Sequence, residues 1–503
     1  MNLGAFLTAT AARSPDRIAL SYAGRRLPYA ELNQRVDALA AGLAGRGLAA
    51  GDRVVLWLRN CPEFIESFFA CWKLGLVAVP VNARLRAADV AFHAADCGAS
   101  ALILGPEFAT GAEQVDVAHR IGTGDCGDVS YDDLVAAYRD VPDQTRPVDD
   151  NAPAWLFYTS GTTGRPKGAV LTHGNLIFVT VSWCADLHCL QPEDVVLHCA
   201  PLSHGAGFHA LAAVARGAEN VVHARFDPSA VLEAISRQHV SAAWLVPTQI
   251  RLLLDCKDLE RTDLSTLTRV VYGGSPMFLG DLTEAVERIG PVFCQLYGQG
   301  ESPMTITYLR REEHRVDRPD VAVLTSAGIA RTGMEVRIAD PDDRVVPVGE
   351  AGEIQVRGPA VMKGYWGRPD ADAEALRGGW LHTGDVGRAD DRGFIYVLDR
   401  LKDLIITGGT NVYAREVEDV LLRHPRVHEA AVFGSRDRLW GEAVTAVVVG
   451  DAVREDDLRA FCREHLADYM RPKRIHLADK LPRNSYGKVL KRELRETYPG
   501  GTE

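Results

Sequence analysis

One loop of eleven residues combines the residue types that bind phosphate groups. It covers residues 158–168, reads YTSGTTGRPKG, and has a short apolar run on each side. Such runs around a glycine-rich loop predict two strands joined by a turn. Glycines let the backbone N–H groups approach a ligand, and the hydroxyls and Lys167 add donors and positive charge. The loop therefore favours a polyphosphate ligand, although a flexible polar hairpin has a similar composition, and it does not fit the P-loop pattern because Pro166 precedes Lys167.

The loop closely resembles the phosphate-binding signature of the adenylate-forming superfamily. This superfamily includes acyl- and aryl-CoA synthetases, firefly luciferase and the adenylation domains of peptide synthetases. Further strings that match the family follow in family order, so the resemblance covers nearly the whole chain; they lie at residues 200–210, 270–277, 295–301, 380–386, 399–413 and 481–488. The resemblance implies an ATP-dependent, AMP-forming acid–thiol ligase that uses ATP, Mg²⁺ and CoA.

Length and charge are typical of a soluble protein with more than one domain. The chain has 503 residues, which exceeds what one hydrophobic core usually accommodates, so two or three domains are expected. Its formal net charge is −11, with 47% hydrophobic and 24% charged residues. This balance argues against binding to nucleic acid or to an anionic membrane surface. An anionic ligand must therefore be held by local donors and metal.

The cysteines and the N-terminal sequence favour a cytoplasmic protein. The ten cysteines are scattered without a Cys-x-x-Cys pair, which is typical of thiols in a reducing compartment. Cys184 and Cys189 lie near His188 and His198, but their spacing is not that of structural zinc sites. The N-terminal residues lack the pattern of a secretion signal, and the apolar stretch at 68–81 is too short to span a bilayer.

The periodicity predicts an α/β fold with layered sheets and helices. Helical and strand-like patterns alternate over residues 1–150, which indicates parallel sheet covered by helices. Alternating patterns between 331 and 368 predict a small antiparallel or barrel-like subdomain. The resemblance implies a large N-terminal nucleotide- and acid-binding domain at 1–399 and a small mobile α+β C-terminal domain at 400–503, which rotates about a hinge at Lys402.

The resemblance also assigns nucleotide-binding roles. Glu301 and Thr159 are expected to hold Mg²⁺, Tyr297 to stack on adenine, and Asp385 with Arg400 to bind the ribose hydroxyls. Gly300 stands where the family usually has a threonine whose hydroxyl touches the nucleotide phosphate. The remaining expected nucleotide-binding residues are Ser160, Gly161, Thr162, Thr163, Gly164, Lys167, Gly273, Gly274, Ser275, Gln295 and Gly298.

Other residues are assigned by resemblance to the acid, the thiol and catalysis. His204 is expected to form a wall and gate of the acid pocket, and Lys488 to be the catalytic lysine. Gly408 and Gly409 are expected to line the tunnel for a pantetheine arm. The remaining predicted pocket residues are His209, Val246, Tyr272 and Gly274. With no obvious cation for a second carboxylate, this set favours a medium-chain or aromatic monocarboxylate.

The implied chemistry joins two anions, because a carboxylate attacks the α-phosphorus of ATP. Lys488, together with Mg²⁺ at Glu301 and Thr159, would supply positive charge, and Arg165 and Lys167 would help to hold the pyrophosphate. Rotation of the C-terminal domain would then bring CoA to the adenylate. The sequence leaves open a different acceptor, such as a carrier-protein thiol or an amine, an unusual acid such as nitrite, and a non-catalytic nucleotide-binding protein.

Overall fold

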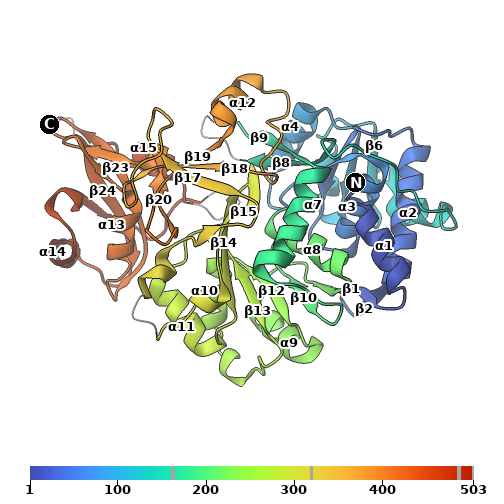
Figure 1. Cartoon of the computed structure of the whole chain (residues 1–503), viewed down its shortest axis with the longest axis horizontal. Coiled ribbons are helices and arrows are strands. Elements are labelled where there is room, and N and C mark those ends of the chain that lie inside the picture. Colours follow the sequence, from blue (N-terminus) through green and yellow to red (C-terminus); the bar gives the residue numbers. More distant parts are fainter. Residues whose placement is uncertain (160–164, 318–320, 484–488, 501–503) are drawn as a thin grey trace. The chain divides into compact units, whose positions relative to one another are not determined.

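The computed structural model describes residues 1–159, 165–317, 321–483 and 489–500. The chain forms two compact units: Met1–Val336 with Val356–His382, and Arg337–Gln355 with Thr383–Glu503. Figure 1 gives the element labels along the chain. The predicted boundary between residues 399 and 400 falls within the second unit and stays a prediction.

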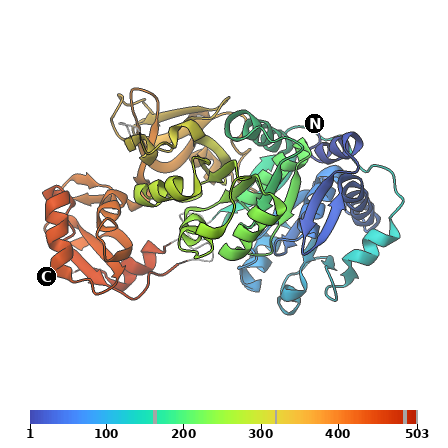
Figure 2. The ribbon, with the colours of Figure 1, turned by 90° about the horizontal axis from the view of Figure 1, so that it is seen from below.

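The first unit contains a seven-stranded sheet with the order β7-β6-β5-β3-β4-β8-β9. All neighbouring strands are parallel except β8 and β9, which form an antiparallel hairpin. Its central strands are continuous apolar runs because helices cover the sheet (Figure 2). The strands are β3 (Arg53–Trp57), β4 (Val77–Pro80), β5 (Ala101–Leu104), β6 (His119–Gly122), β7 (Val129–Ser130), β8 (Pro153–Thr159) and β9 (Lys167–Thr172), and the helices within this part of the chain are α2 (Tyr29–Gly45), α3 (Pro62–Leu74), α4 (Ala87–Cys97), α5 (Ala109–Ala112) and α6 (Tyr131–Ala137).

A second, nine-stranded sheet of the first unit has the order β16-β15-β14-β13-β12-β10-β11-β1-β2. Strands β10, β12, β13 and β14 are parallel neighbours, so their carboxyl ends meet at one edge, where ligands bind in open α/β sheets. The strands are β1 (Ile18–Tyr22), β2 (Arg25–Pro28), β10 (Val195–His198), β11 (Glu219–Val222), β12 (Ala242–Leu245), β13 (Arg269–Tyr272), β14 (Phe293–Gln299), β15 (Ser302–Leu309) and β16 (Ile329–Ala330), and the remaining helices of this unit are α1 (Ala5–Arg13), α7 (His173–Ser182), α8 (Gly205–Arg216), α9 (Pro228–Gln238), α10 (Pro247–Leu254), α11 (Leu279–Ile289) and α12 (Pro369–Ala375).

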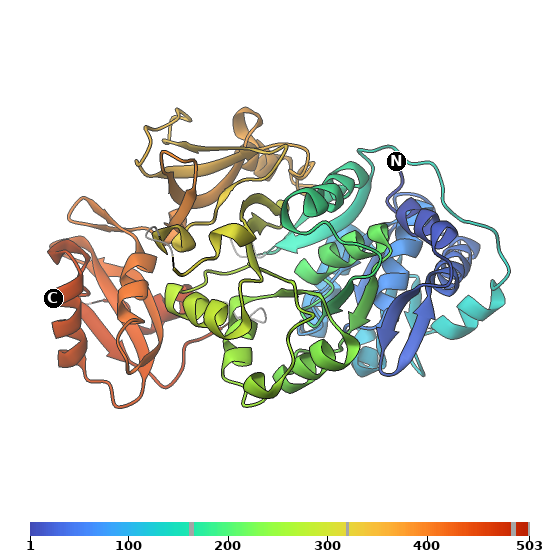
Figure 3. The same ribbon diagram turned by 60° about the horizontal axis from the view of Figure 1, so that its bottom comes forward.

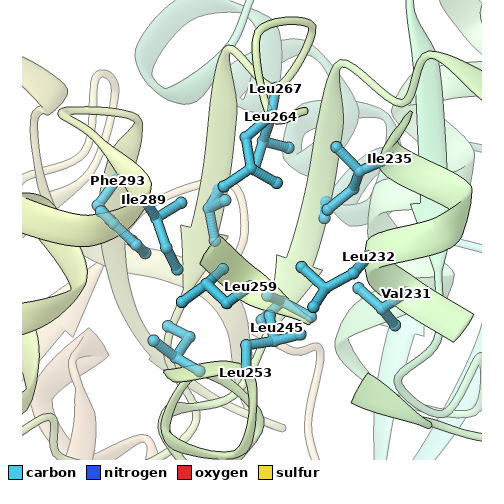
Figure 4. Close-up of a pocket in the computed structure, with 13 residues that line it drawn as sticks. Val231, Leu232, Ile235, Leu245, Leu253, Leu259, Leu264, Leu267, Ile289 and Phe293 are labelled. Atoms are coloured by element: carbon cyan, nitrogen blue, oxygen red, sulfur yellow. The ribbon is translucent and has the colours of Figure 1, made fainter. Parts of the chain in front are cut away.

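A small cavity beside the nine-stranded sheet is part of the hydrophobic core. Apolar side chains from α9, α10, α11 and the adjoining strands point toward one another around it (Figure 4). Leu232, Leu253, Leu264 and Phe293 are among them. Burying a carboxylate or phosphate there without a polar partner would be costly, so this cavity is a packing defect of the core and no site for ATP or an acid.

The second unit contains two small sheets and, among its described residues, three α-helices. One sheet has the order β17-β18-β19-β20, and the other pairs β22-β21-β24-β23 with β25 alongside β24. Figure 3 shows helices against the strands of the second sheet, in orange and red. The strands are β17 (Glu335–Ala339), β18 (Gly352–Arg357), β19 (Leu381–Ala389), β20 (Ile395–Arg400), β21 (Ile405–Thr407), β22 (Thr410–Val412), β23 (Val427–Asp437), β24 (Gly441–Gly450) and β25 (Arg474–Leu477), and the helices are α13 (Ala414–Leu421), α14 (Glu455–His465) and α15 (Lys491–Thr497).

The alternation predicted for residues 1–150 is confirmed, because the parallel strands β3, β4 and β5 alternate with the helices α3 and α4. The two strands predicted around the glycine-rich loop are β8 and β9. Over the described residues, no helix combines the length and the apolar character that crossing a membrane requires.

Candidate active site

The β8–β9 hairpin places two of the predicted residues opposite each other. Thr159 ends β8 and Lys167 begins β9, and the two are cross-strand partners. Lys167 Nζ lies 4.3 Å from the centre of the Tyr365 ring, and the Arg165 guanidinium lies 5.7 Å from the ring of Phe92. The predicted residues Ser160, Gly161, Thr162, Thr163, Gly164 and Lys488 lie outside the described residues.

The Glu301 carboxylate is held by two hydroxyl groups. Thr159 Oγ1 donates to Glu301 Oε1 over 3.1 Å, and the Tyr365 hydroxyl donates to the same oxygen over 2.8 Å. Burial, together with the nearby negative charge of Glu301, raises the pKa of Tyr365, so this hydroxyl remains a donor. The structure thus brings together Thr159 and Glu301, the two predicted magnesium ligands.

Glycines are required where β14 turns into β15. A Cβ atom on Gly298 would lie 2.4 Å from the backbone nitrogen of Met304. A Cβ atom on Gly300 would lie 2.4 Å from Thr159 Cγ2 and 2.6 Å from Phe157 Cδ1. The space that a threonine side chain would need at position 300 is therefore filled by Thr159 and Phe157.

Several predicted residues follow the carboxyl ends of the parallel strands. Val246 follows β12 and is half-buried, whereas Gly274 and Ser275 follow β13 and are exposed. Gly274 has a φ of 82°, and a Cβ atom on Gly273 would lie 2.3 Å from the Leu296 carbonyl oxygen. Gln295 and Tyr297 are half-buried residues of β14, next to this edge.

His204 immediately precedes α8, in the connection that follows β10. Its Nδ1 atom lies 2.8 Å from Ser203 Oγ, and its ring meets that of Phe157 edge-on, with the centres 5.2 Å apart. Burial lowers the pKa of His204 to about 4, so the imidazole is neutral at physiological pH. A neutral ring is suited to forming a wall of a pocket for an organic acid.

Two predicted pocket residues are fully buried. His209 stacks on Trp183 with ring centres 4.4 Å apart, and the Tyr272 hydroxyl lies 3.0 Å from His314 Nε2. Burial holds the pKa of His209 well below its usual value. Their assignment to the acid pocket stays a prediction.

In the second unit, the two predicted ribose-binding residues lie opposite each other on β19 and β20. Arg400 Nε lies 3.2 Å from Asp385 Oδ1, and the backbone nitrogen of Asp385 donates to Thr383 Oγ1. Asp385 is nearly buried, with 4% of the residue exposed. The predicted hinge residue, Lys402, follows two residues later and is exposed.

Gly408 and Gly409 form the two-residue turn of the β21–β22 hairpin, which we call the glycine hairpin. Thr407 and Thr410 are partners across it, and the φ angles of the two glycines are 55° and 80°. Such a turn needs two left-handed residues, which explains the Gly-Gly pair. The Gly408 nitrogen donates to the Trp440 carbonyl over 2.8 Å, whereas nothing lies within 4 Å of a Cβ position on Gly409.

The oxygen donors around Glu301 fit a magnesium ion. Magnesium prefers one or two carboxylates together with phosphate oxygens and water, and Glu301 with Thr159 supplies hard oxygens beside the phosphate-binding loop. No group of three or more His, Cys, Asp or Glu side chains that could hold a metal occurs in the described ranges. These residues therefore suit a metal that arrives with ATP.

Sequence reasoning missed two residues at this site, Phe157 and Tyr365. Phe157 belongs to the apolar run before the loop and gives no sign that it faces His204 and Gly300. Tyr365 lies 64 positions after Glu301, and neither spacing nor periodicity links the two. Only the fold places them side by side.

Two family models cover most of the chain. The model for "AMP-binding enzyme" matches residues 7–366, and the model for "AMP-binding enzyme C-terminal domain" matches residues 416–488. A feruloyl-CoA synthase from Amycolatopsis is 40% identical over 502 residues, which is 99% of each chain.

Solved structures agree over the full length. The amide bond synthetase McbA from Marinactinospora thermotolerans is 31% identical, with a TM-score of 0.90, over 99% of this chain and 100% of its own. O-succinylbenzoate coenzyme A synthetase from Bacillus subtilis, in complex with ATP and a magnesium ion, is 34% identical, with a TM-score of 0.86, over 97% and 99%.

These similarities confirm three sequence predictions: the α/β fold with a large N-terminal and a small C-terminal domain, the ATP-dependent acid–thiol ligase class, and ATP, Mg²⁺ and CoA as ligands. With a matching family model over well beyond half of its length and a relative at 40% identity, this chain belongs to the AMP-binding enzyme family.

Proposed function

We propose that this enzyme activates an aromatic monocarboxylic acid of the cinnamic type and transfers its acyl group to CoA. The observation that carries the proposal is the Glu301 carboxylate, which Thr159 and Tyr365 hold beside the phosphate-binding loop. The acid class is supported by the 40% identity with a feruloyl-CoA synthase along the full chain. Phe157 and the neutral ring of His204 supply aromatic surface for such an acid.

In the first half-reaction, a carboxylate oxygen of the acid attacks the α-phosphorus of ATP, and pyrophosphate leaves. The role assigned to Lys488 is to offset the charge of the two anions, and the role assigned to Lys167 and Arg165 is to hold the departing phosphates. Glu301 and Thr159 would hold magnesium, which would neutralise phosphate oxygens. The backbone at Gly273, Gly274 and Ser275 and the face of Tyr297 hold the adenine, and Asp385 and Arg400 bind the ribose.

In the second half-reaction, the CoA thiolate attacks the acyl carbonyl carbon and AMP leaves. We propose that the pantetheine arm passes the glycine hairpin, because Gly409 offers backbone without a side chain. Rotation of the C-terminal domain about Lys402 withdraws Lys488 and presents this hairpin. Val246 and Gly274 line the acid pocket in both states.

An amine is the second candidate acceptor. It is favoured by the full-length similarity to an amide bond synthetase, with a TM-score of 0.90. A carrier-protein thiol is a third acceptor of the same chemical class as CoA.

We also propose a cytoplasmic location, because all ten cysteines are free thiols.

The test is a panel of acids with and without CoA. Purified enzyme is given ATP, Mg²⁺ and cinnamic, benzoic, medium-chain or dicarboxylic acids, and both pyrophosphate exchange and AMP release are measured. We expect exchange with the cinnamic acids and AMP release that needs free CoA. AMP release that needs an amine instead would assign the second function, and an absence of exchange with every aromatic acid would overturn the proposed substrate class.

A further inference from the structure

Tyr365 lies against the exit strand of the phosphate-binding loop. Its segment runs beside β9: the Val170 nitrogen donates to the Gly364 carbonyl, and the Trp366 nitrogen donates to the Gly168 carbonyl, each over 2.8 Å. Between these two hydrogen bonds, Ala169 and Tyr365 form a β-bridge. Tyr365 is 9% exposed. Its backbone is therefore fixed to the strand that begins at Lys167.

The hydroxyl of Tyr365 and that of Thr159 donate to the same oxygen of Glu301, Oε1. Within the part of the chain that the structure describes, no donor reaches the other oxygen, Oε2. Two donors on one oxygen fix the rotation of the carboxylate, and they leave the second oxygen to bind a cation. Thr159 lies on β8 and Tyr365 pairs with β9, so both strands of the hairpin contribute a hydrogen bond to the carboxylate.

The ring of Tyr365 has a second contact. Lys167 Nζ lies 4.3 Å from the ring centre, a distance at which an aromatic face attracts an ammonium group. In the described ranges Lys167 forms no ion pair. One side chain thus holds the ammonium by its ring and the carboxylate by its hydroxyl, so the two charges remain available to a ligand instead of neutralising each other.

We propose that Tyr365 is a positioning residue for the metal and the polyphosphate. Its hydroxyl fixes the orientation of Glu301, so that Oε2 would be available to a magnesium ion, and its ring keeps Lys167 available for the phosphate groups. The proposal rests on the metal-binding role proposed above for Glu301. It adds to the site a residue from a segment distant in sequence from both the loop and Glu301.

The test measures metal binding without turnover, using Mn²⁺ and a non-hydrolysable ATP analogue. Free Mn²⁺ is followed by electron paramagnetic resonance, and analogue affinity without metal is measured by calorimetry. Tyr365→Phe keeps the ring and removes the hydroxyl, so we expect Mn²⁺ affinity to fall about 10-fold, as for other outer partners of metal ligands, with metal-free analogue affinity unchanged. Tyr365→Leu removes both contacts and should weaken the metal-free analogue as well.

A matched control is Tyr131→Phe. The Tyr131 hydroxyl also donates over 2.8 Å to a buried glutamate, Glu66, in the N-terminal part of the chain. This variant loses an equivalent hydrogen bond and should leave Mn²⁺ affinity unchanged, so a general loss of stability cannot imitate the expected result.

Unchanged Mn²⁺ affinity in Tyr365→Phe would overturn the proposal. Glu301→Gln in the same assay separates this failure from a failure of the site itself. If Glu301→Gln weakens Mn²⁺ binding and Tyr365→Phe does not, the role of Tyr365 is wrong while the site stands. If Glu301→Gln also leaves Mn²⁺ affinity unchanged, the proposed metal site and the proposed role of Tyr365 are both wrong. Thermal unfolding shows which Tyr365 variants fold. Because both variants lack the hydroxyl, the Mn²⁺ affinity of either folded variant tests the proposal.

Discussion

The first unit contains the Glu301 cluster, formed by Glu301, Thr159 and Tyr365, and the second unit contains the glycine hairpin. The two regions are built in opposite ways. Glu301 is held by Thr159 and Tyr365 from two separate segments, and its orientation is set before any ligand arrives. At the hairpin, Gly409 has a left-handed backbone and nothing near its Cβ position. We propose that the first region is preorganised for the charges of phosphoryl chemistry, and that the second lacks side chains so that a pantetheine arm can pass. On this proposal, the two half-reactions depend on different kinds of structure.

The largest effect is expected from Glu301→Gln. The change keeps the shape of the side chain but removes the charge that we propose binds the metal. Pyrophosphate exchange should fall by about 100-fold or more, since even the outer partners of a metal ligand contribute about 10–100-fold. Thioester formation from a supplied acyl-adenylate should remain close to that of the unchanged enzyme. Equal losses in both assays would contradict the separation of the two regions.

A smaller, opposite effect is expected from Gly409→Leu. The new side chain has room in the folded protein but would occupy the proposed path of the pantetheine arm. Thioester formation should fall about tenfold, the scale on which pockets discriminate single groups, while pyrophosphate exchange is unchanged. Gly393→Leu is the control, because Gly393 also has a positive φ, 83°, and open space around it. If both variants lose thioester formation equally, backbone strain is the cause and the tunnel role is wrong.

Gly300→Thr tests how tightly the side chains next to the Glu301 cluster are packed. Restoring the threonine that the family usually has should harm this enzyme, because the added Cβ would lie within 2.6 Å of both Thr159 and Phe157. We expect the free energy of unfolding to fall by about 1–3 kcal/mol, with slower adenylation. Adding Phe157→Leu should recover part of both losses, as a double-mutant cycle would show. A Gly300→Thr variant that adenylates faster than the parent enzyme would contradict the claim that Thr159 and Phe157 fill the space beside position 300.

Mild acid is expected to affect the two units differently. Burial lowers the pKa to about 4 for five imidazoles of the first unit: His93, His173, His198, His204 and His314. Between pH 6.5 and 4 the unfolded chain therefore binds protons that the folded unit excludes, so the free energy of unfolding falls as the pH falls. Hydrogen exchange at pH 7 and pH 5 should show protection lost mainly in the first unit. Equal protection at both pH values would contradict these pKa shifts.

Motif order and periodicity predicted the family, the strands around the phosphate-binding loop and the parallel layers, because these features depend on short-range pattern. Thr159 and Glu301 were paired correctly as neighbours. Tyr365 and Phe157 could not be found, since their roles come from contacts between distant segments. His209 and Tyr272 show the same limit, because a histidine or tyrosine near a motif gives no indication of which side of the sheet it faces.

The central claim is that adenylation and thiol transfer use different parts of one enzyme. Lys488→Ala tests it most directly when both half-reactions are measured on the same preparation. We expect pyrophosphate exchange to fall on the order of 100-fold or more, since we propose that Lys488 offsets charge only in that step, and transfer from a supplied acyl-adenylate to CoA to be retained. A parallel loss of both activities would contradict it.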